Sequence, residues 1–193
     1  METGSSPRET AMNVVRKWSG IWGLAPKNLM LAGPFPGDDR TEQTLMWDRE
    51  TETYGFTAVY FKQNVQGVPV YNSRLQVLVR NESGYPAVSI GTDLRNVEAL
   101  RGVQKPATID RQMVTARAND FLGSDAAIVS EPEMVVYAGY DFENVPATFA
   151  YAFEAKVGGP EDVDNYQKAR YIIDATTGEL LRKENLILNC THN

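Results

Sequence analysis

The apolar residues near the N-terminus recur every three or four positions, a spacing typical of an amphipathic helix. Thr10 or Ser6 can cap the start of this helix, and Gly20, Gly23 and Pro26 mark its end. The residues expected on its buried face are Ala11, Val14, Val15, Trp18, Ile21 and Trp22.

The period changes to two between Thr44 and Gly91, which predicts β-strands. Phe56–Phe61 is rich in aromatic and β-branched residues, and Leu75, Val77 and Val79 alternate with polar side chains. Gln66-Gly67 and Ser83-Gly84 provide the turns between strands, because glycine tolerates a positive φ. This segment is therefore predicted to be an antiparallel meander with the helix packed on it.

The second half of the chain repeats the order of helix and then strands. Gly102–Pro106 is a junction, Thr108 can cap a second helix that ends near Gly123, and the residues expected on the buried face of this helix are Val114, Ala118, Phe121 and Leu122. Strands are expected at Met134–Tyr140, Thr148–Val157, Arg170–Asp174 and Leu180–Leu188. The predicted class is α+β, with a first domain over 10–103 and a second over 104–193. Residues 1–9 are expected to be a leader that is disordered or introduced for expression.

Composition narrows the classes of function. The chain has 193 residues and a net charge of −6, which argues against a broad basic surface for nucleic acid. No apolar run approaches the roughly 20 residues that a membrane-spanning helix needs. Met1–Ser6 lacks the basic start and apolar stretch of a signal peptide, which leaves a cytosolic location and a removed leader open.

The candidate chemistry is sparse. A single histidine, His192, rules out a His-Glu-x-x-His zinc site within this sequence, and no glycine-rich phosphate loop is present. The acidic stretches at Asp38-Asp39 and Glu161–Asn165 match no calcium-loop spacing, so we interpret them as solvated loops rather than cation sites. Asn81-Glu82-Ser83 and Asn189-Cys190-Thr191 match the pattern for N-glycosylation in a eukaryotic secretory pathway. No cofactor and no enzymatic activity of this chain are predicted.

Cys190 and His192 form the one pair with reactive side chains. In an extended strand both point to the same side, and thiolate and imidazole are both good zinc ligands. The structural alternative is a terminal tail that carries two unrelated residues. Cys190 is the only cysteine, so it can form a disulfide only with another chain or with a residue beyond the end of this sequence.

Two turn motifs resemble a known family. Gln63-x-x-x-Gly67-Val68-Pro69-Val70 resembles the propeptide motif of thermolysin-like and fungalysin-like zinc metallopeptidases, and the helix that ends in Gly23–Pro26 is similar to the leading helix of that FTP module. The run from Tyr171 to Leu180, with Asp174 and Gly178, resembles the end of the PepSY module that follows in the same propeptides. The two motifs stand in the family's order, and the resemblance covers about residues 10–188.

The resemblance implies a fold and a role. Both modules would be cystatin-like units, each with one helix on a curved antiparallel sheet. The chain would be a non-catalytic propeptide, secreted or at the cell surface, that assists folding of a metallopeptidase on the same precursor and inhibits it. The tail after Leu188, with Cys190 and His192, would face the enzyme's cleft. The sequence departs from the family at Ala58, where a histidine often stands, and it stops near Asn193, about where the family continues toward the mature enzyme.

Two other hypotheses come from different classes. In the first, the chain is a protein-binding or scaffolding module of a large secreted or cell-surface protein that lacks a peptidase, and this module binds partners by strand addition. Alternatively it is an enzyme that acts through Cys190 and His192, which alkylation of Cys190 would test.

Overall fold

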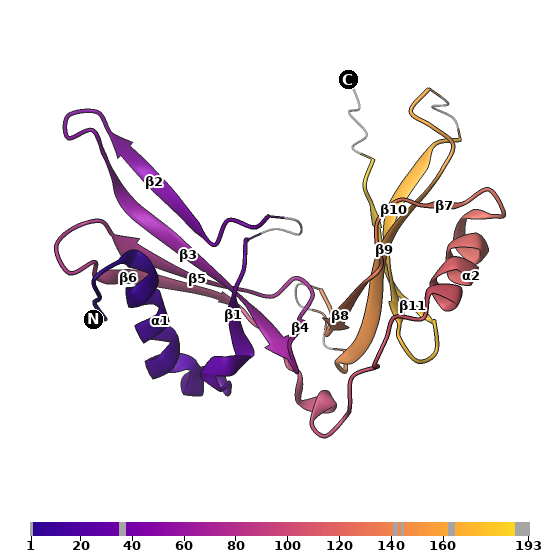
Figure 1. Ribbon diagram of the computed structural model, residues 1–193, viewed down its shortest axis with the longest axis horizontal. Helices are drawn as coiled ribbons and strands as arrows, with labels where there is room; N and C mark the ends of the chain where they lie inside the picture. Colours follow the sequence, from indigo (N-terminus) through magenta and orange to yellow (C-terminus); the bar gives the residue numbers. More distant parts are fainter. Residues whose placement is uncertain (1, 35–37, 141–142, 144, 162–164, 188–193) are drawn as a thin grey trace. The chain divides into compact units, whose positions relative to one another are not determined.

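The computed structural model describes residues 2–34, 38–140, 143, 145–161 and 165–187. The chain divides into two compact units, Met1–Arg95 and Asn96–Asn193. The division falls earlier than the predicted junction at Gly102–Pro106. Each unit contains one antiparallel sheet with one α-helix packed against it, so the predicted α+β class with two helix-on-sheet units is confirmed (Figure 1).

The first unit begins with α1 (Pro7–Trp18), which continues as the 3₁₀ helix η1 (Ser19–Trp22). Ser6 is the cap, since its side chain accepts from the Glu9 amide at 3.2 Å. The other candidate, Thr10, is fully buried and donates to the Tyr85 carbonyl at 2.7 Å. Residues 2–9 belong to this unit rather than preceding it: the Glu2 carbonyl accepts from the Ala87 amide, and α1 starts at Pro7.

The sheet of the first unit is built around β3 (Thr53–Val65). One edge of β3 pairs with β2 (Glu42–Asp48) and β1 (Leu29–Leu31), and the other with β5 (Arg74–Arg80) and β4 (Val68–Pro69). β6 (Ala87–Asp93) adds to β5, and the short 3₁₀ helix η2 (Pro26–Asn28) precedes β1. The core joins α1 to one face of the sheet and consists of Ala11, Val14, Val15, Leu29, Val59, Phe61, Leu75, Val77 and Val79.

The predicted apolar face of the first helix is only partly buried. Ala11, Val14 and Val15 are buried and Trp22 packs against the core, but Trp18 is 38% exposed and Ile21 is 71% exposed. The change to 3₁₀ geometry at Ser19 accounts for Ile21, because three residues per turn instead of 3.6 rotate it away from the sheet.

The second unit starts with the 3₁₀ helix η3 (Glu98–Leu100) and α2 (Arg111–Leu122). Its sheet has the order β11 (Leu180–Asn185), β10 (Gln167–Asp174), β9 (Thr148–Val157) and β7 (Ala127–Ile128), and β8 (Glu133–Tyr137) also pairs with β9. Val114 and Ala118 are buried, and the rings of Phe121, Tyr171 and Phe153 stack in sequence at centroid distances of 5.0 and 5.6 Å.

The predicted cap of the second helix is wrong. Asp110, not Thr108, caps α2, because its carboxylate accepts from the Met113 amide at 2.9 Å. The Thr108 carbonyl instead accepts from the Tyr151 hydroxyl at 3.2 Å.

In the described part of the chain, no helix is both long and apolar enough to cross a membrane.

Candidate functional site: the two turn motifs and the surfaces near them

The first motif forms a tight hairpin between β3 and β4. Val65 pairs with Val68, and the two residues between them, Gln66 and Gly67, have φ values of 54° and 80°. Positive φ at both central positions is the signature of a type I′ turn, which matches the twist of the flanking strands. The predicted turn at Gln66-Gly67 is therefore confirmed.

Pro69 follows this turn without disturbing the sheet. The amide of the next residue, Val70, donates to the Gln63 carbonyl at 2.8 Å. Since successive backbone amides of a strand point to opposite sides, the nitrogen of Pro69 points away from β3, where a missing N–H costs no ladder hydrogen bond. Val70 itself is fully buried.

Gln63 is the centre of the first motif's hydrogen bonds. Its side chain is fully buried, and its amide group meets the backbone of Arg95 twice: Nε2 donates to the Arg95 carbonyl at 2.9 Å, and Oε1 accepts from the Arg95 amide at 2.8 Å. The Gln63 backbone amide donates to the hydroxyl of Ser73 at 3.0 Å, and that hydroxyl donates to the Val70 carbonyl. Gln63 thus fixes the last residue of the first unit to the middle of its sheet.

The second motif closes the β10–β11 hairpin. One carboxylate oxygen of Asp174 accepts from the backbone amides of Thr176 and Thr177, each at 2.8 Å, and the other accepts from the Thr148 hydroxyl at 2.8 Å. Burial alone would raise the pKa of Asp174. The hydrogen bonds from the Thr177 amide, the Thr148 hydroxyl and the Thr176 amide outweigh burial and lower that pKa below its ordinary value.

Gly178 ends this turn with a φ of 70°. A Cβ atom at this position would lie 2.9 Å from Nε of Arg117 and 3.2 Å from Sδ of Met113, both on α2. The glycine therefore meets two requirements, a left-handed backbone and a close approach of the turn to the helix.

Both motifs therefore have structural roles that the fold itself explains. Their six predicted residues (Gln63, Gly67, Pro69, Val70, Asp174 and Gly178) form two separate turns, one in each unit, rather than one constellation of reactive groups. Ala58, where the family often has a histidine, is fully buried in β3 opposite Gln43 and Leu78.

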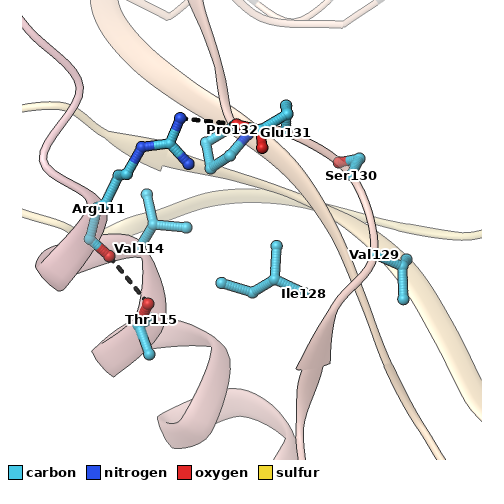
Figure 2. Close-up of a pocket in the computed structure, with 8 residues that line it drawn as sticks. All are labelled: Arg111, Val114, Thr115, Ile128, Val129, Ser130, Glu131 and Pro132. Atoms are coloured by element: carbon cyan, nitrogen blue, oxygen red, sulfur yellow. Dashed lines mark hydrogen bonds and ion pairs between the residues drawn. The ribbon is translucent and has the colours of Figure 1, made fainter.

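A shallow groove lies beside α2 in the second unit (Figure 2). Its volume is about 440 Å³, and its lining comes from α2, from Ile128 at the end of β7 and from residues 129–132 between β7 and β8. Arg111 and Glu131 form an exposed ion pair across it at 2.7 Å, while Val114 and Ile128 provide an apolar floor. The polar side chains of the groove all have partners in the fold: Arg111 pairs with Glu131, the Thr115 hydroxyl donates to the Arg111 carbonyl at 2.9 Å, and the Ser130 hydroxyl accepts from the Glu154 amide at 2.8 Å.

Other predicted candidates fall outside the part of the chain that the structure describes. Cys190 and His192 both do, as does the second glycosylation motif. Of the acidic stretch Glu161–Asn165, only the two end residues are described. Among the described residues there is no group of three or more His, Cys, Asp or Glu side chains placed to hold a metal ion.

The structure reveals one surface that sequence reasoning missed. Met46, Trp47 and Tyr54, in the outer part of the β2–β3 hairpin, are 71%, 52% and 41% exposed. Alternation of apolar and polar residues predicted a strand here, and apolar residues of a strand are expected to face a core. That pattern does not indicate where a hairpin extends past the neighbouring strands of its sheet.

Comparisons with known proteins add no relative: no protein-family model matches the chain, and no curated protein matches it.

Proposed function

We propose that the chain is a non-catalytic propeptide that acts as intramolecular chaperone and inhibitor of a thermolysin- or fungalysin-type zinc metallopeptidase. The observation that carries the proposal is the placement of the two motifs. Each motif closes a hairpin of a helix-on-sheet unit, the first in unit one and the second in unit two. This is the order that the resemblance to the propeptides requires.

The chemistry of such a role is binding rather than catalysis. A folding enzyme gains a preformed surface on which its own strands and helices assemble, and the two sheets with their rigid turns are such surfaces. Inhibition requires a segment that occupies the cleft, which we assign to the tail after Leu188. On this proposal the chain is secreted or at the cell surface, and its partner is a catalytic domain of the same precursor.

The experiment is a pair of assays with the purified chain and the thermolysin- or fungalysin-type peptidase encoded in the same genome. We expect the chain to inhibit peptide hydrolysis at a concentration close to that of the enzyme, and to raise the yield of active enzyme after dilution from denaturant. An unrelated α+β protein of similar charge is the control. If the chain changes neither the rate of hydrolysis nor the refolding yield, the proposal is refuted.

A second function, a protein-binding or scaffolding module, is favoured by the edges of the first sheet. β6 is an edge strand: its Ala87 amide donates to the Glu2 carbonyl, and the following residues 88–92 carry no charged side chain, with Ile90 39% exposed. Such an edge accepts an added strand from a partner. A full-length gene with adhesive repeats and without a His-Glu-x-x-His motif would favour this function over the first.

A further inference from the structure

The outer part of the β2–β3 hairpin extends beyond the rest of its sheet. We call residues 46–54 the arm. The β3–β5 ladder begins where Phe56 pairs with Arg80, and past this point Asn81 donates to the carbonyls of Gly55 and Tyr54. Farther out, the ladder that the structure describes consists of β2 and β3 alone, with Trp47 opposite Tyr54 and Asp48 opposite Thr53. Figure 1 shows this two-stranded ribbon reaching past β5 and β6.

The arm carries large apolar side chains without a core behind them. The rings of Trp47 and Tyr54 meet edge to face at a centroid distance of 4.9 Å, and both remain about half exposed, while Met46 is more exposed still. A two-stranded ribbon in water gains little from such side chains. Tryptophan, tyrosine and methionine are, however, the residues enriched at the centres of protein interfaces.

These apolar residues continue onto the sheet itself. Val59 and Phe61 of β3 point toward α1, so by strand alternation Tyr54 and Phe56 point to the opposite face. Phe56 pairs with Leu45 as Tyr54 pairs with Trp47, which extends the apolar row inward from the arm. The row therefore lies on the face of the sheet that α1 does not cover.

The tip of the arm is acidic. Residues 48–52 include Asp48, Glu50 and Glu52 but only one cation, Arg49. None of these four residues takes part in an ion pair between described residues, and the Asp48 carboxylate instead accepts from the Glu50 amide at 2.9 Å. With three carboxylates and one guanidinium the tip is net negative, and it would attract a positively charged surface.

Met46 adopts a backbone conformation that its residue type disfavours. Its φ is 59°, in the left-handed region that glycine occupies more easily. Strained positions of this kind gather at binding sites, where contacts with a partner offset the strain. Here the strained residue is also the most exposed of the three apolar residues.

From these observations we infer that the arm is a docking element that inserts Met46 and Trp47 into an apolar depression with a basic rim on the peptidase catalytic domain. This inference rests on the proposed function. It gives the first unit a contact of its own with the enzyme, separate from the cleft-facing tail of the second.

The test measures binding of the full chain to the purified catalytic domain of the genome-encoded peptidase by surface plasmon resonance. We expect Trp47→Ala to weaken binding by about tenfold or more, as loss of a central aromatic residue does. The matched control is Ile21→Ala, since Ile21 is 71% exposed in the same unit but stands outside the arm. It is expected to change binding by less than about twofold.

A second variant tests the charge. Glu50→Lys combined with Glu52→Lys should lower the association rate by about tenfold and reduce its dependence on salt, because the steering charge is reversed. Both residues are exposed, so this variant keeps the fold even if the tryptophan variant does not. Circular dichroism of each variant checks the fold.

The outcomes separate the two proposals. Equal binding by wild-type, Trp47→Ala and the charge variant overturns the docking arm and leaves the proposed function standing. Failure of the wild-type chain to bind refutes the proposed function and the arm with it. A wild-type dimer in light scattering that Trp47→Ala dissociates would identify a second copy as the occupant, and this too overturns the inference.

Discussion

Gln63 provides the sharpest test of how the first unit is held together. Its side-chain amide is fully buried and satisfies both the amide and the carbonyl of Arg95. Gln63→Ala would leave both backbone groups without their partner in a partly buried place. Since each such loss costs about 1–3 kcal/mol, we expect the unfolding free energy of the first unit to fall by about 2–4 kcal/mol. With a urea dependence near 1.5 kcal/mol per molar, the midpoint would fall by about 2 M.

The assay is urea unfolding followed by tryptophan fluorescence. All three tryptophans, Trp18, Trp22 and Trp47, lie in the first unit, so this signal reports its unfolding alone. The control is Gln43→Ala, because Gln43 is exposed and accepts one hydrogen bond from the Tyr60 hydroxyl at 3.0 Å. We expect this control to cost less than about 1 kcal/mol.

Gln63→Glu adds a test with a defined pH dependence. A glutamate at this position donates to the Arg95 carbonyl only when it is protonated, so burial and this hydrogen bond raise its pKa. A group whose pKa is raised on folding stabilises the fold below its unfolded value of about 4.3, and this contribution is lost as the pH rises through the folded value. The variant should therefore approach wild-type stability in acid and lose it toward neutral pH. Two results would contradict this role of Gln63 in holding Arg95. One is a loss of unfolding free energy in Gln63→Ala that is no larger than in Gln43→Ala, and the other is a stability of Gln63→Glu that does not fall from acid to neutral pH.

Three further predictions follow from the turns. Asp174→Ala should destabilise the second unit by about 1–3 kcal/mol at neutral pH. Because the pKa of Asp174 is lowered on folding, the wild-type carboxylate stabilises the fold above its unfolded pKa and loses this effect as the pH falls through the folded one. The difference between wild-type and variant in thermal melts by circular dichroism should therefore shrink in acid, and a constant difference would contradict this. Gly67 has a φ of 80° and open space around it, so Gly67→Ala should lower the unfolding free energy by about 1–2 kcal/mol through the backbone alone. Gly178→Ala should lower it by more, because Arg117 and Met113 must also move. If urea unfolding shows equal losses of unfolding free energy for the two glycine variants, the close approach of Gly178 to α2 does not add to the cost of a side chain there. Pro69→Ala should change stability by less than about 1 kcal/mol, since its nitrogen points away from β3, and a larger loss would refute that orientation.

Local pattern predicted the regular elements of the fold well. The strand expected at Thr148–Val157 has these bounds in the structure, and Ser6 was one of two candidate caps for the first helix. The short strands β1 and β7 were not predicted, because two or three residues are too few to show alternation. The cap predicted at Thr108 is two residues too early, because α2 begins at Arg111 and its cap is Asp110.

The contacts that explain the motifs are long-range and could not be predicted from local pattern. Gln63 meets Arg95 across 32 positions, and Gly178 meets Arg117 and Met113 of a helix far earlier in the chain. The exposure of Trp47 has a similar origin. Whether β2 and β3 extend past the sheet depends on where β5 stops, and the alternation within β2 carries no information about the length of β5.

The motif residues serve the fold, so the function is tested best at residues that the fold does not require. Gln63, Gly67, Asp174 and Gly178 are each required by a turn or by a buried hydrogen bond, so any chain with this fold benefits from them whether or not it binds a peptidase. Residues that the fold requires are evidence for the fold. A choice between propeptide and scaffolding module has to come from residues whose exposure the fold does not require. Trp47, half exposed on an arm with a net negative tip, is such a residue, and its substitution separates binding from stability.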